Sequence, residues 1–489
     1  MKKSKVRVRF APSPTGMMHL GNVRTALMNY IFAKQKNGIS VLRIEDTDPE
    51  RNFDPGAKHI IKDLQWLDLH YDEGPSVRDT STQGPFKPYF QSKRLEIYQE
   101  KLNILIKNKQ VYRCFCTQEE LEKKRQRQIA LKMPPRYDRT CLDLSDDEIQ
   151  KKLDSNIPFI RRVKLDHKSK ITINDIAHKN ITFDLKNFSD FPITRQNGTF
   201  TFMFANFVDD MVMKISHVLR GEDHLSNTAG QVALYKTFNA TIPTFWHMPI
   251  LCNLDGKKLS KRDFGFSLND LKNAGYLPEA ICNYLAIIGG SFEKEIMSLD
   301  ELSKAINFDH LHAKGQIKYD VEKLRWVNHK WIDRYDSKKL YEACLPYLQD
   351  LHEEIKKIPE KKLEQIIQII KTDLITLNDI KKTLEPYFIE PEIKQSDLIK
   401  ISDKKTVDTV SQIIQENIKN IENSNIFLSK LKSMSKQEGI SIKALFSIVR
   451  IGLMGSAKGP GISELIEILG TDKTKKRIEK LLETINKTN

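Results

Sequence analysis

The feature that most constrains the fold of this chain is an alternation of strand and helix patterns within its first 44 residues. Apolar residues occupy every second position in VRVRF (residues 6–10), which predicts a strand. From Val23 the apolar positions follow helical spacing as far as Asn37 and Gly38, a pair typical of a left-handed helix end. The segment ISVLRI (residues 39–44) predicts a second strand. A strand, a helix and a strand with short joins form a βαβ unit, so we expect a parallel sheet.

Length and composition indicate a large folded protein with a basic surface. The 489 residues allow three or more domains, and 39% hydrophobic with 29% charged residues is ordinary for a globular chain. Lys and Arg number 79 against 64 Asp and Glu, a net charge of +15. This excess suits a polyanionic partner such as nucleic acid, although a lysine-biased surface explains it equally well.

From its start and its hydropathy we expect neither an export signal nor a membrane span in this chain. The basic start MKKSK leads into VRVRFAPSP and not into an apolar signal segment, and no stretch approaches the roughly 20 apolar residues of a membrane span. Six cysteines in so long a chain do not make a disulfide framework. We therefore expect a soluble, reduced, cytoplasmic protein.

The pattern changes twice along the chain. Residues 106–205 combine a charged helix with short alternating segments and an Asn-Gly hairpin signal at 197–198, typical of a mixed insertion into the parallel domain. No glycine occurs from 316 to 438, and apolar stripes at helical spacing predict a helical last third.

The string RFAPSPTGMMHLGN (residues 9–22) follows the first predicted strand at the sheet edge where ligands bind in parallel sheets. Its prolines stiffen the turn, Gly21 allows close approach to the main chain, and the helix that follows offers oriented N–H groups to a phosphate. His19 can donate a hydrogen bond to a phosphate oxygen. Neither common glycine-rich phosphate loop is present, and for His19 alone the simpler interpretation is a helix cap.

A second string, GKKLSKR (residues 256–262), places four basic side chains around a serine between Gly256 and Gly265. Such a loop could close over a triphosphate and neutralise the charge of departing pyrophosphate. Alone it would be interpreted as a solvated surface loop. The pairing with the histidine turn favours a nucleotide site.

Taken together, HLGN and KLSKR resemble the two signature motifs of class I aminoacyl-tRNA synthetases. RFAPSPTG, RIEDTDPER, VLRGEDHLSNT, HMPIL and YDVEKLRWVNHKWI resemble the bacterial-type glutamyl-tRNA synthetase family, and LMGSAKGPGISELIEILG extends the resemblance almost to the end of the chain. The resemblance implies a glutamate–tRNA ligase, which condenses ATP, with Mg²⁺, and L-glutamate to glutamyl-adenylate and transfers the glutamyl group to the 3′ end of tRNA(Glu).

The same resemblance implies a multidomain α/β plus all-α fold. We expect a split Rossmann catalytic domain with a doubly wound parallel sheet (residues 1–105 and 206–250) and an α+β acceptor-binding insertion (106–205). A stem-contact region with the KLSKR loop (251–335) and a helical anticodon-binding region (336–489) would follow.

The site residues follow by matching motifs. His19 and Lys261 are expected to be catalytic, and the expected ATP-binding residues are His19, Gly21, Asn22, Lys258, Ser260, Lys261 and Arg262. The expected glutamate-binding residues are Arg9, Ala11, Ser13, Glu45, Phe202, Asn206 and Arg220. Glutamate carries two carboxylates and one ammonium, so two cations and one acid at predicted strand ends suit it. Phe202 departs from the family, where a tyrosine is common, so its hydroxyl contact is missing or comes from another group.

The cysteines suggest a metal site. Some family members bind zinc through C-x-C and C-x-H; here Cys114, Cys116 and Cys141 match, while Asp143 stands in place of the histidine. Zinc binding and a set of reduced cysteines left from an ancestral site both remain open. The other three cysteines, Cys252, Cys282 and Cys344, suit buried packing.

Several alternatives share parts of this pattern. Glutaminyl-tRNA synthetases share the catalytic half but read the anticodon with β-barrels, and the queuosine-modifying paralogue lacks the C-terminal region. A non-catalytic tRNA-binding paralogue has no need of HLGN or KLSKR, and a simple nucleotidyltransferase lacks the large C-terminal part. Whether tRNA(Gln) is also charged stays open, and a monomer is the default expectation.

Overall fold

The computed structural model describes residues 5–76, 82–308, 311, 316–348 and 358–487. The chain divides into two compact units, Met1–Leu271 with Pro278–Lys323 and Lys272–Leu277 with Leu324–Asn489. Among the described residues no helix has the length and apolar character needed to cross a membrane.

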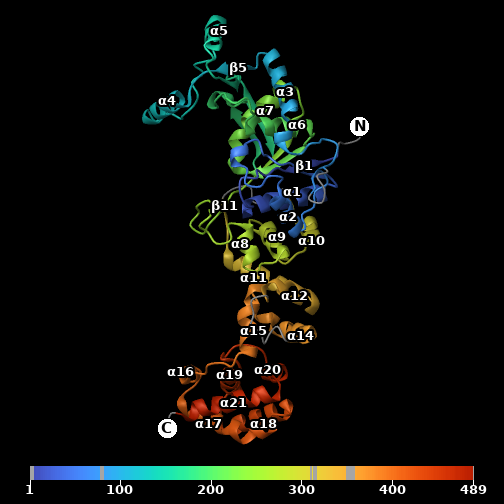
Figure 1. The fold of residues 1–489 in the computed structure, drawn as a ribbon, viewed down its shortest axis with the longest axis vertical. Helices are drawn as coiled ribbons and strands as arrows, with labels where there is room; N and C mark the ends of the chain where they lie inside the picture. Colours follow the sequence, from blue (N-terminus) through green and yellow to red (C-terminus); the bar gives the residue numbers. More distant parts are fainter. Residues whose placement is uncertain (1–4, 77–81, 309–310, 312–315, 349–357, 488–489) are drawn as a thin grey trace. The chain divides into compact units, whose positions relative to one another are not determined.

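The predicted βαβ unit opens the first unit (Figure 1). Strand β1 (Arg7–Phe10) pairs in parallel with β2 (Ile39–Leu42), and α1 (Leu20–Gln35) connects them. All four residues of β1 are buried, so the alternating pattern does not mark a half-exposed strand. Arg7 is accommodated there because its guanidinium pairs with Glu73 at 2.7 Å.

The end of α1 refines the expected helix cap. Asn37, and not Gly38, takes the left-handed conformation, with a φ of 45°. A Cβ atom on Gly38 would lie 2.7 Å from the carbonyl oxygen of Val6, so the glycine allows β2 to begin close beside the first strand.

A second group of strands completes the parallel sheet. Strand β9 (His217–Gly221) pairs in parallel with β10 (Thr244–Met248), and β10 pairs with β7 (Lys170–Asp175), which pairs antiparallel with β8 (Lys179–Asp184). The amide of Ser216 donates to the carbonyl of Arg7 at 3.0 Å and connects β9 to β1. A hairpin from the expected insertion therefore extends the catalytic sheet.

The remaining elements of the first unit surround these strands and form smaller ribbons. The helices are α2 (Lys58–Trp66), α3 (Leu95–Lys107), α4 (Gln118–Ala130), α5 (Asp146–Asp154), α6 (Phe202–Val212), α7 (Leu225–Thr237), α8 (Leu268–Asn273), α9 (Pro278–Ile287) and α10 (Leu299–Ala305). The short strands are β3 (Gly74–Pro75), β4 (Thr82–Gln83), β5 (Val111–Cys114), β6 (Ile160–Val163), β11 (Leu251–Cys252) and β12 (Ile317–Lys318).

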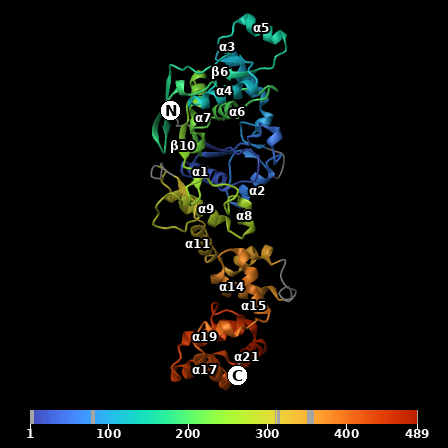
Figure 2. The same ribbon diagram turned by 90° about the vertical axis from the view of Figure 1, so that its left-hand side faces the viewer.

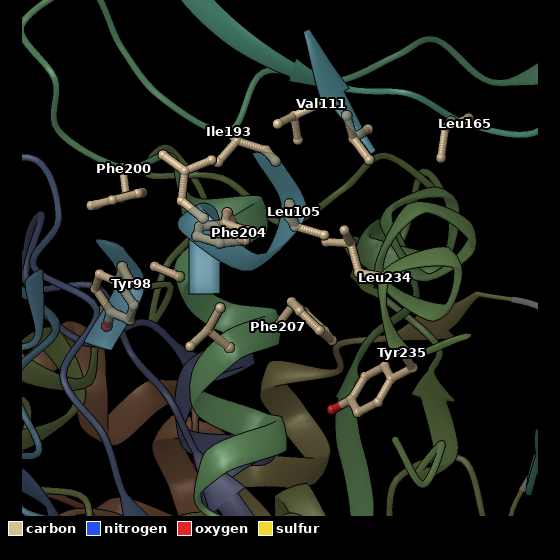
Figure 3. Close-up of a cluster of buried hydrophobic side chains, with 14 residues drawn as sticks. Tyr98, Leu105, Val111, Leu165, Ile193, Phe200, Phe204, Phe207, Leu234 and Tyr235 are labelled. Atoms are coloured by element: carbon tan, nitrogen blue, oxygen red, sulfur yellow. The ribbon is translucent and has the colours of Figure 1, made fainter. Parts of the chain in front are cut away.

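One hydrophobic cluster joins the expected insertion to helices that pack beside the parallel sheet. Figure 3 shows Phe204 and Phe207 of α6 together with Leu105 of α3, Val111 of β5 and Leu234 of α7. These side chains come from both sides of the insertion boundaries, so burying them fixes the base of the insertion against α6 and α7. Figure 2 shows α6 and α7 next to one another.

The hairpin expected at 197–198 is present as a tight turn. The amide of Arg195 donates to Thr199 at 2.7 Å, and Gly198 has a φ of 79°. The turn is flanked by a single antiparallel bridge between Thr194 and Phe200 instead of two long strands.

Among its described residues the second unit contains helices and no strand, as the glycine-free stretch 316–438 and its apolar spacing predict. Its helices are α11 (Val321–Ile332, which begins in the first unit), α12 (Ser337–Cys344), α14 (Glu360–Ile370), α15 (Ile380–Phe388), α16 (Gln395–Ile399), α17 (Lys404–Asn417), α18 (Ser424–Gln437), α19 (Ile442–Met454), α20 (Ile462–Leu469) and α21 (Thr471–Asn486).

Two of the apolar stripes predicted in the helical last third, those on α14 and α17, face the interior of this unit. Leu363, Ile366, Ile367 and Ile370 of α14 are buried, as are Val407, Val410 and Ile414 of α17. Cys252, Cys282 and Cys344 are buried and unpaired, as expected for packing residues.

Candidate active site

One cavity of about 740 Å³ lies at the carboxyl ends of β1, β9 and β10, where parallel sheets bind ligands. It brings together most of the residues singled out in the sequence. Those that line it are Arg9, Ala11, Ser13, His19, Gly21, Asn22, Glu45, Phe202, Asn206, Arg220, Lys258 and Lys261. Ser260 and Arg262 do not line it.

His19 has two roles in the local structure. It is the N-cap of α1, where its Nδ1 accepts a hydrogen bond from Asn22 N at 3.3 Å, and it also lines the cavity. Burial, and then the charge of Lys258, lowers the pKa of His19, so the ring is neutral at pH 7. A neutral imidazole that accepts at Nδ1 carries its proton on Nε2. The helix cap thus leaves His19 with one N–H to donate.

Gly21 makes room for this ring. A Cβ atom at position 21 would lie 3.0 Å from Cε1 and 3.1 Å from Nδ1 of His19. The absence of a side chain at position 21 therefore leaves space for the imidazole and also gives a ligand access to the start of α1.

The basic loop contributes two of its side chains to the cavity. Lys258 and Lys261 line it, and Lys258 Nζ lies 3.0 Å from Asp223 Oδ2. Ser260 has a different role, because its amide and hydroxyl both donate to Asp263 Oδ2, at 2.8 and 2.9 Å. This turn shapes the loop, which explains why Ser260 is directed away from the cavity.

The segment after the loop runs back along the histidine turn. The amide of Leu20 donates to Phe266 at 3.0 Å, the amide of Leu268 donates to Met18 at 2.9 Å, and the ring of Phe266 stacks on His19. These backbone bonds fix the basic loop beside the start of α1.

Behind the cavity lies a buried group of paired charges. Arg9 Nε lies 3.1 Å from Asp210 Oδ1, and Arg43 lies between Asp210, at 2.6 Å, and Glu45, at 3.0 Å. Asn206 Nδ2 donates to the same Glu45 oxygen, Oε1, at 2.6 Å. The network holds Glu45 by one oxygen, so the other carboxylate oxygen can accept from a bound ligand.

Burial affects the two acids of this group differently. It raises the pKa of Glu45, and Arg43 offsets this only in part. Burial would also raise the pKa of Asp210, but Arg43 and Arg9 outweigh it and hold that pKa below its usual range. Asp210 is therefore a fixed anion that holds Arg9.

Arg220 differs from these cations. Among the described residues no carboxylate forms an ion pair with it, and its nearest acceptor is Thr228 Oγ1 at 2.6 Å. Burial, followed by repulsion from Arg9, lowers its pKa to about 9, so it remains charged at pH 7. A buried cation held by neutral acceptors favours an anionic ligand.

Sequence analysis missed several residues of this cavity. His224 lies beside Phe202, with ring centroids 5.7 Å apart, and the segment 248–251 lines the wall after β10. Both belong to motifs already noted, GEDH and HMPIL, and both follow strands. Their position after a strand was the signal that could have identified them.

The cysteine cluster lies apart from this cavity. The sulfurs of Cys114, Cys116 and Cys141 all lie within 4.8 Å of one another, while Asp143 is exposed and is not in the group. The hydroxyl of Tyr137 lies 3.3 Å from Cys114 Sγ and 3.9 Å from Cys116 Sγ. The structure therefore places a tyrosine, and not the aspartate, next to the three thiols.

Comparison with known proteins agrees with this geometry. The family described as class I tRNA synthetases (E and Q), catalytic domain, matches residues 5–326, and an anticodon binding domain matches 339–482. Glutamate–tRNA ligase of Sulfurihydrogenibium sp. is 36% identical over 98% of this chain and 99% of its own length. That of Bacillus licheniformis is 34% identical over 98% of this chain and all of its own length.

Solved structures show the same relationship. The crystal structure of a glutamate tRNA ligase from Elizabethkingia meningosepticum in complex with its amino acid has a TM-score of 0.84 and 31% identity, covering 99% of this chain and 100% of that one. The fold and the two motifs at one cavity thus define a class I aminoacyl-tRNA synthetase. Within that class, the chain belongs to the glutamate–tRNA ligase family.

Proposed function

We propose that this protein is a glutamate–tRNA ligase that activates L-glutamate with ATP and transfers the glutamyl group to the 3′ end of tRNA(Glu). One observation carries the proposal. A single cavity is lined both by His19, Lys258 and Lys261 and by Arg9, Glu45 and Arg220. The first set suits a triphosphate, and the second suits an amino acid with an acidic side chain.

The charges of the second set balance those of glutamate. The ammonium group would pair with Glu45, and the two carboxylates would pair with Arg220 and with the part of Arg9 that Asp210 does not engage. Each charge of the ligand then has a partner, which is required because an unpaired buried charge costs several kcal/mol.

Adenylate formation requires attack of a glutamate carboxylate oxygen on the α-phosphorus of ATP, with release of pyrophosphate. His19 Nε2–H and the amino end of α1 would donate to the α-phosphate, where negative charge develops. Lys261, with Lys258, would neutralise the departing pyrophosphate. Mg²⁺ accompanies the ATP in this proposal.

The parts beyond the cavity are proposed to hold tRNA. Residues 106–205 would contact the acceptor end, 251–335 the stem, and the helical region from 336 the anticodon, which agrees with the anticodon binding match to 339–482. The net charge of +15 suits this partner, and binding should weaken steeply with salt. A cytoplasmic monomer accords with this function.

The cysteine cluster is proposed to hold zinc. Two sulfurs bound to one tetrahedral zinc ion at about 2.3 Å each would lie roughly 3.8 Å apart, and Cys116 Sγ and Cys141 Sγ are separated by 3.6 Å. The set fits the ion. Cys114, Cys116 and Cys141 would bind it with the Tyr137 hydroxyl as a fourth donor, and the ion would crosslink the insertion at a structural site.

Aminoacylation of separately transcribed tRNA(Glu) and tRNA(Gln) with radiolabelled glutamate tests the function. Charging of tRNA(Glu) is expected. If tRNA(Gln) is also charged with labelled glutamate, the enzyme is non-discriminating. If neither tRNA is charged, the proposal is contradicted.

A further inference from the structure

Arg220 is held by a chain of buried hydrogen bonds that ends on a carboxylate outside the cavity. Its Nη2 donates to Thr228 Oγ1 at 2.6 Å, and Thr228 Oγ1 lies 2.8 Å from His247 Nε2. The other ring nitrogen of His247, Nδ1, lies 2.7 Å from Asp175 Oδ2. Thr228, His247 and Asp175 are completely buried, and none of them lines the cavity.

Four separate elements supply these residues. Arg220 and His247 are opposite each other on the parallel strands β9 and β10, and Thr228 comes from α7. Asp175 ends β7, the hairpin strand that the insertion adds to the sheet. The amides of Ala177, His178 and His247 also donate to its carboxylate, at 2.9, 2.8 and 3.1 Å, so Asp175 is held as an anion in a fixed position.

One arrangement of protons gives a continuous chain of hydrogen bonds from Arg220 to Asp175. The Asp175 carboxylate must accept, so His247 carries its proton on Nδ1 and presents a lone pair at Nε2. In this arrangement Thr228 donates its hydroxyl proton to Nε2 at 2.8 Å, closer than the carbonyl of His224 at 3.3 Å, and accepts from Arg220. Arg220 Nε also donates to His247 Nε2, at 3.5 Å. Burial is the main cause that lowers the pKa of His247, which agrees with a neutral ring beside a cationic guanidinium.

The arrangement holds Arg220 without neutralising it. A carboxylate in direct contact would pair with the guanidinium, as Asp210 does with Arg9. Here the carboxylate is separated from Arg220 by neutral groups. Arg220 is oriented mainly by the Thr228 hydroxyl at 2.6 Å, with longer contacts to His247 Nε2 at 3.5 Å and the carbonyl of His224 at 3.4 Å, and it keeps its charge for a ligand.

We propose that Asp175, His247 and Thr228 are positioning residues that orient Arg220 toward the substrate carboxylate while leaving its charge unpaired. This inference rests on the proposed function, because it concerns the glutamate carboxylate. It assigns a role in amino-acid recognition to a residue of the insertion.

Steady-state aminoacylation by full-length variants tests the proposal. Thr228→Val removes only the hydroxyl and is expected to raise the KM for glutamate about tenfold while the KM for ATP is unchanged, since a hydrogen bond to a charged group is lost. Thr228→Ser restores the hydroxyl and should restore the KM. Thr237→Val is the matched control, because Thr237 lies on the same helix and its hydroxyl donates to a backbone carbonyl one turn away, that of Ala233, at 3.0 Å.

A second measurement tests the chain of bonds. Asp175→Asn should raise the KM for glutamate in the same direction, and the double variant with Thr228→Val should be no worse than Thr228→Val alone, because both act through Arg220. This variant also keeps the test informative if Thr228→Val does not fold.

The outcomes separate the two proposals. If the wild-type protein charges tRNA and Thr228→Val keeps the wild-type KM for glutamate, the positioning role alone is overturned. If Thr228→Val impaired every kinetic constant equally and Thr228→Ser did not restore them, the positioning role would be overturned as well. A wild-type protein that charges no tRNA with glutamate would overturn both.

Discussion

The rings of His19 and Phe266 stack with their centroids 5.1 Å apart and their planes inclined by 24°. His19 caps α1 near the start of the chain, whereas Phe266 follows the basic loop, beyond the midpoint of the chain. Their contact, with the hydrogen bond from Leu20 to Phe266, brings two motifs that are distant in the sequence to one cavity.

Lys261 is expected to act mainly on the chemical step. Lys261→Ala should lower the rate of adenylate formation by about 100- to 1000-fold, because a cation at the departing pyrophosphate is lost, while glutamate binding remains nearly unchanged. Glutamate-dependent pyrophosphate exchange in the presence of tRNA measures the step. Lys257→Ala is the control, since Lys257 is exposed and does not line the cavity. Full exchange by Lys261→Ala would remove this lysine from the mechanism.

Gly21 is expected to be intolerant of a methyl group. In Gly21→Ala the new Cβ would lie 3.0 Å from the imidazole of His19, so the ring and its Nε2–H must move by a few tenths of an ångström. We expect the rate of adenylate formation to fall about tenfold or more. Gly461→Ala, also at a helix start but with its nearest neighbour 3.5 Å away, should behave like the wild type. Equal rates in both variants would contradict the role given to the ring.

Glutamate binding should depend on pH through Glu45. Burial raises the pKa of this carboxyl, so it takes up a proton at a higher pH than an ordinary glutamate. The protonated form cannot pair with the substrate ammonium, and the KM for glutamate should therefore rise as the pH is lowered. The KM for ATP serves as the internal control. Glu45→Gln should have a high KM for glutamate throughout, and a wild-type KM in this variant would exclude the pairing.

Protein purified without chelators should contain about one zinc ion per chain, because three cysteine sulfurs lie within 4.8 Å of one another, beside the hydroxyl of Tyr137. Tyr137→Phe should bind zinc more weakly, whereas Asp143→Asn should bind it as the wild type does. Elemental analysis and competition with a colorimetric chelator measure both. Protein free of zinc, or zinc lost only in Asp143→Asn, would contradict the assignment.

Much of this fold is predictable because it rests on local patterns. The βαβ unit, the helical last third and the turn at 197–198 follow from spacing and turn chemistry over short stretches. The burial of Arg7 and Arg43 does not follow in that way. Both depend on carboxylates, Glu73 and Asp210, that come from distant segments.

The site residues divide in the same way, into those that local motifs predict and those that depend on contacts between segments. Twelve of the residues selected by motif matching line one cavity, because each motif follows a strand or begins a helix. It could not separate Lys261 from Ser260, since the turn made with Asp263 decides which of them faces the cavity. Nor could spacing show that Tyr137, four residues before Cys141, lies beside the thiols where Asp143 was expected.

The central claim is that the histidine turn and the basic loop bind one nucleotide between them. The crystal structure of the protein with bound ATP tests it most directly. The account predicts that the triphosphate lies in the cavity, with His19 Nε2 within hydrogen-bonding distance of the α-phosphate and Lys261 Nζ at the phosphates that leave. Triphosphate bound elsewhere, or contacting only one of these two segments, would contradict it.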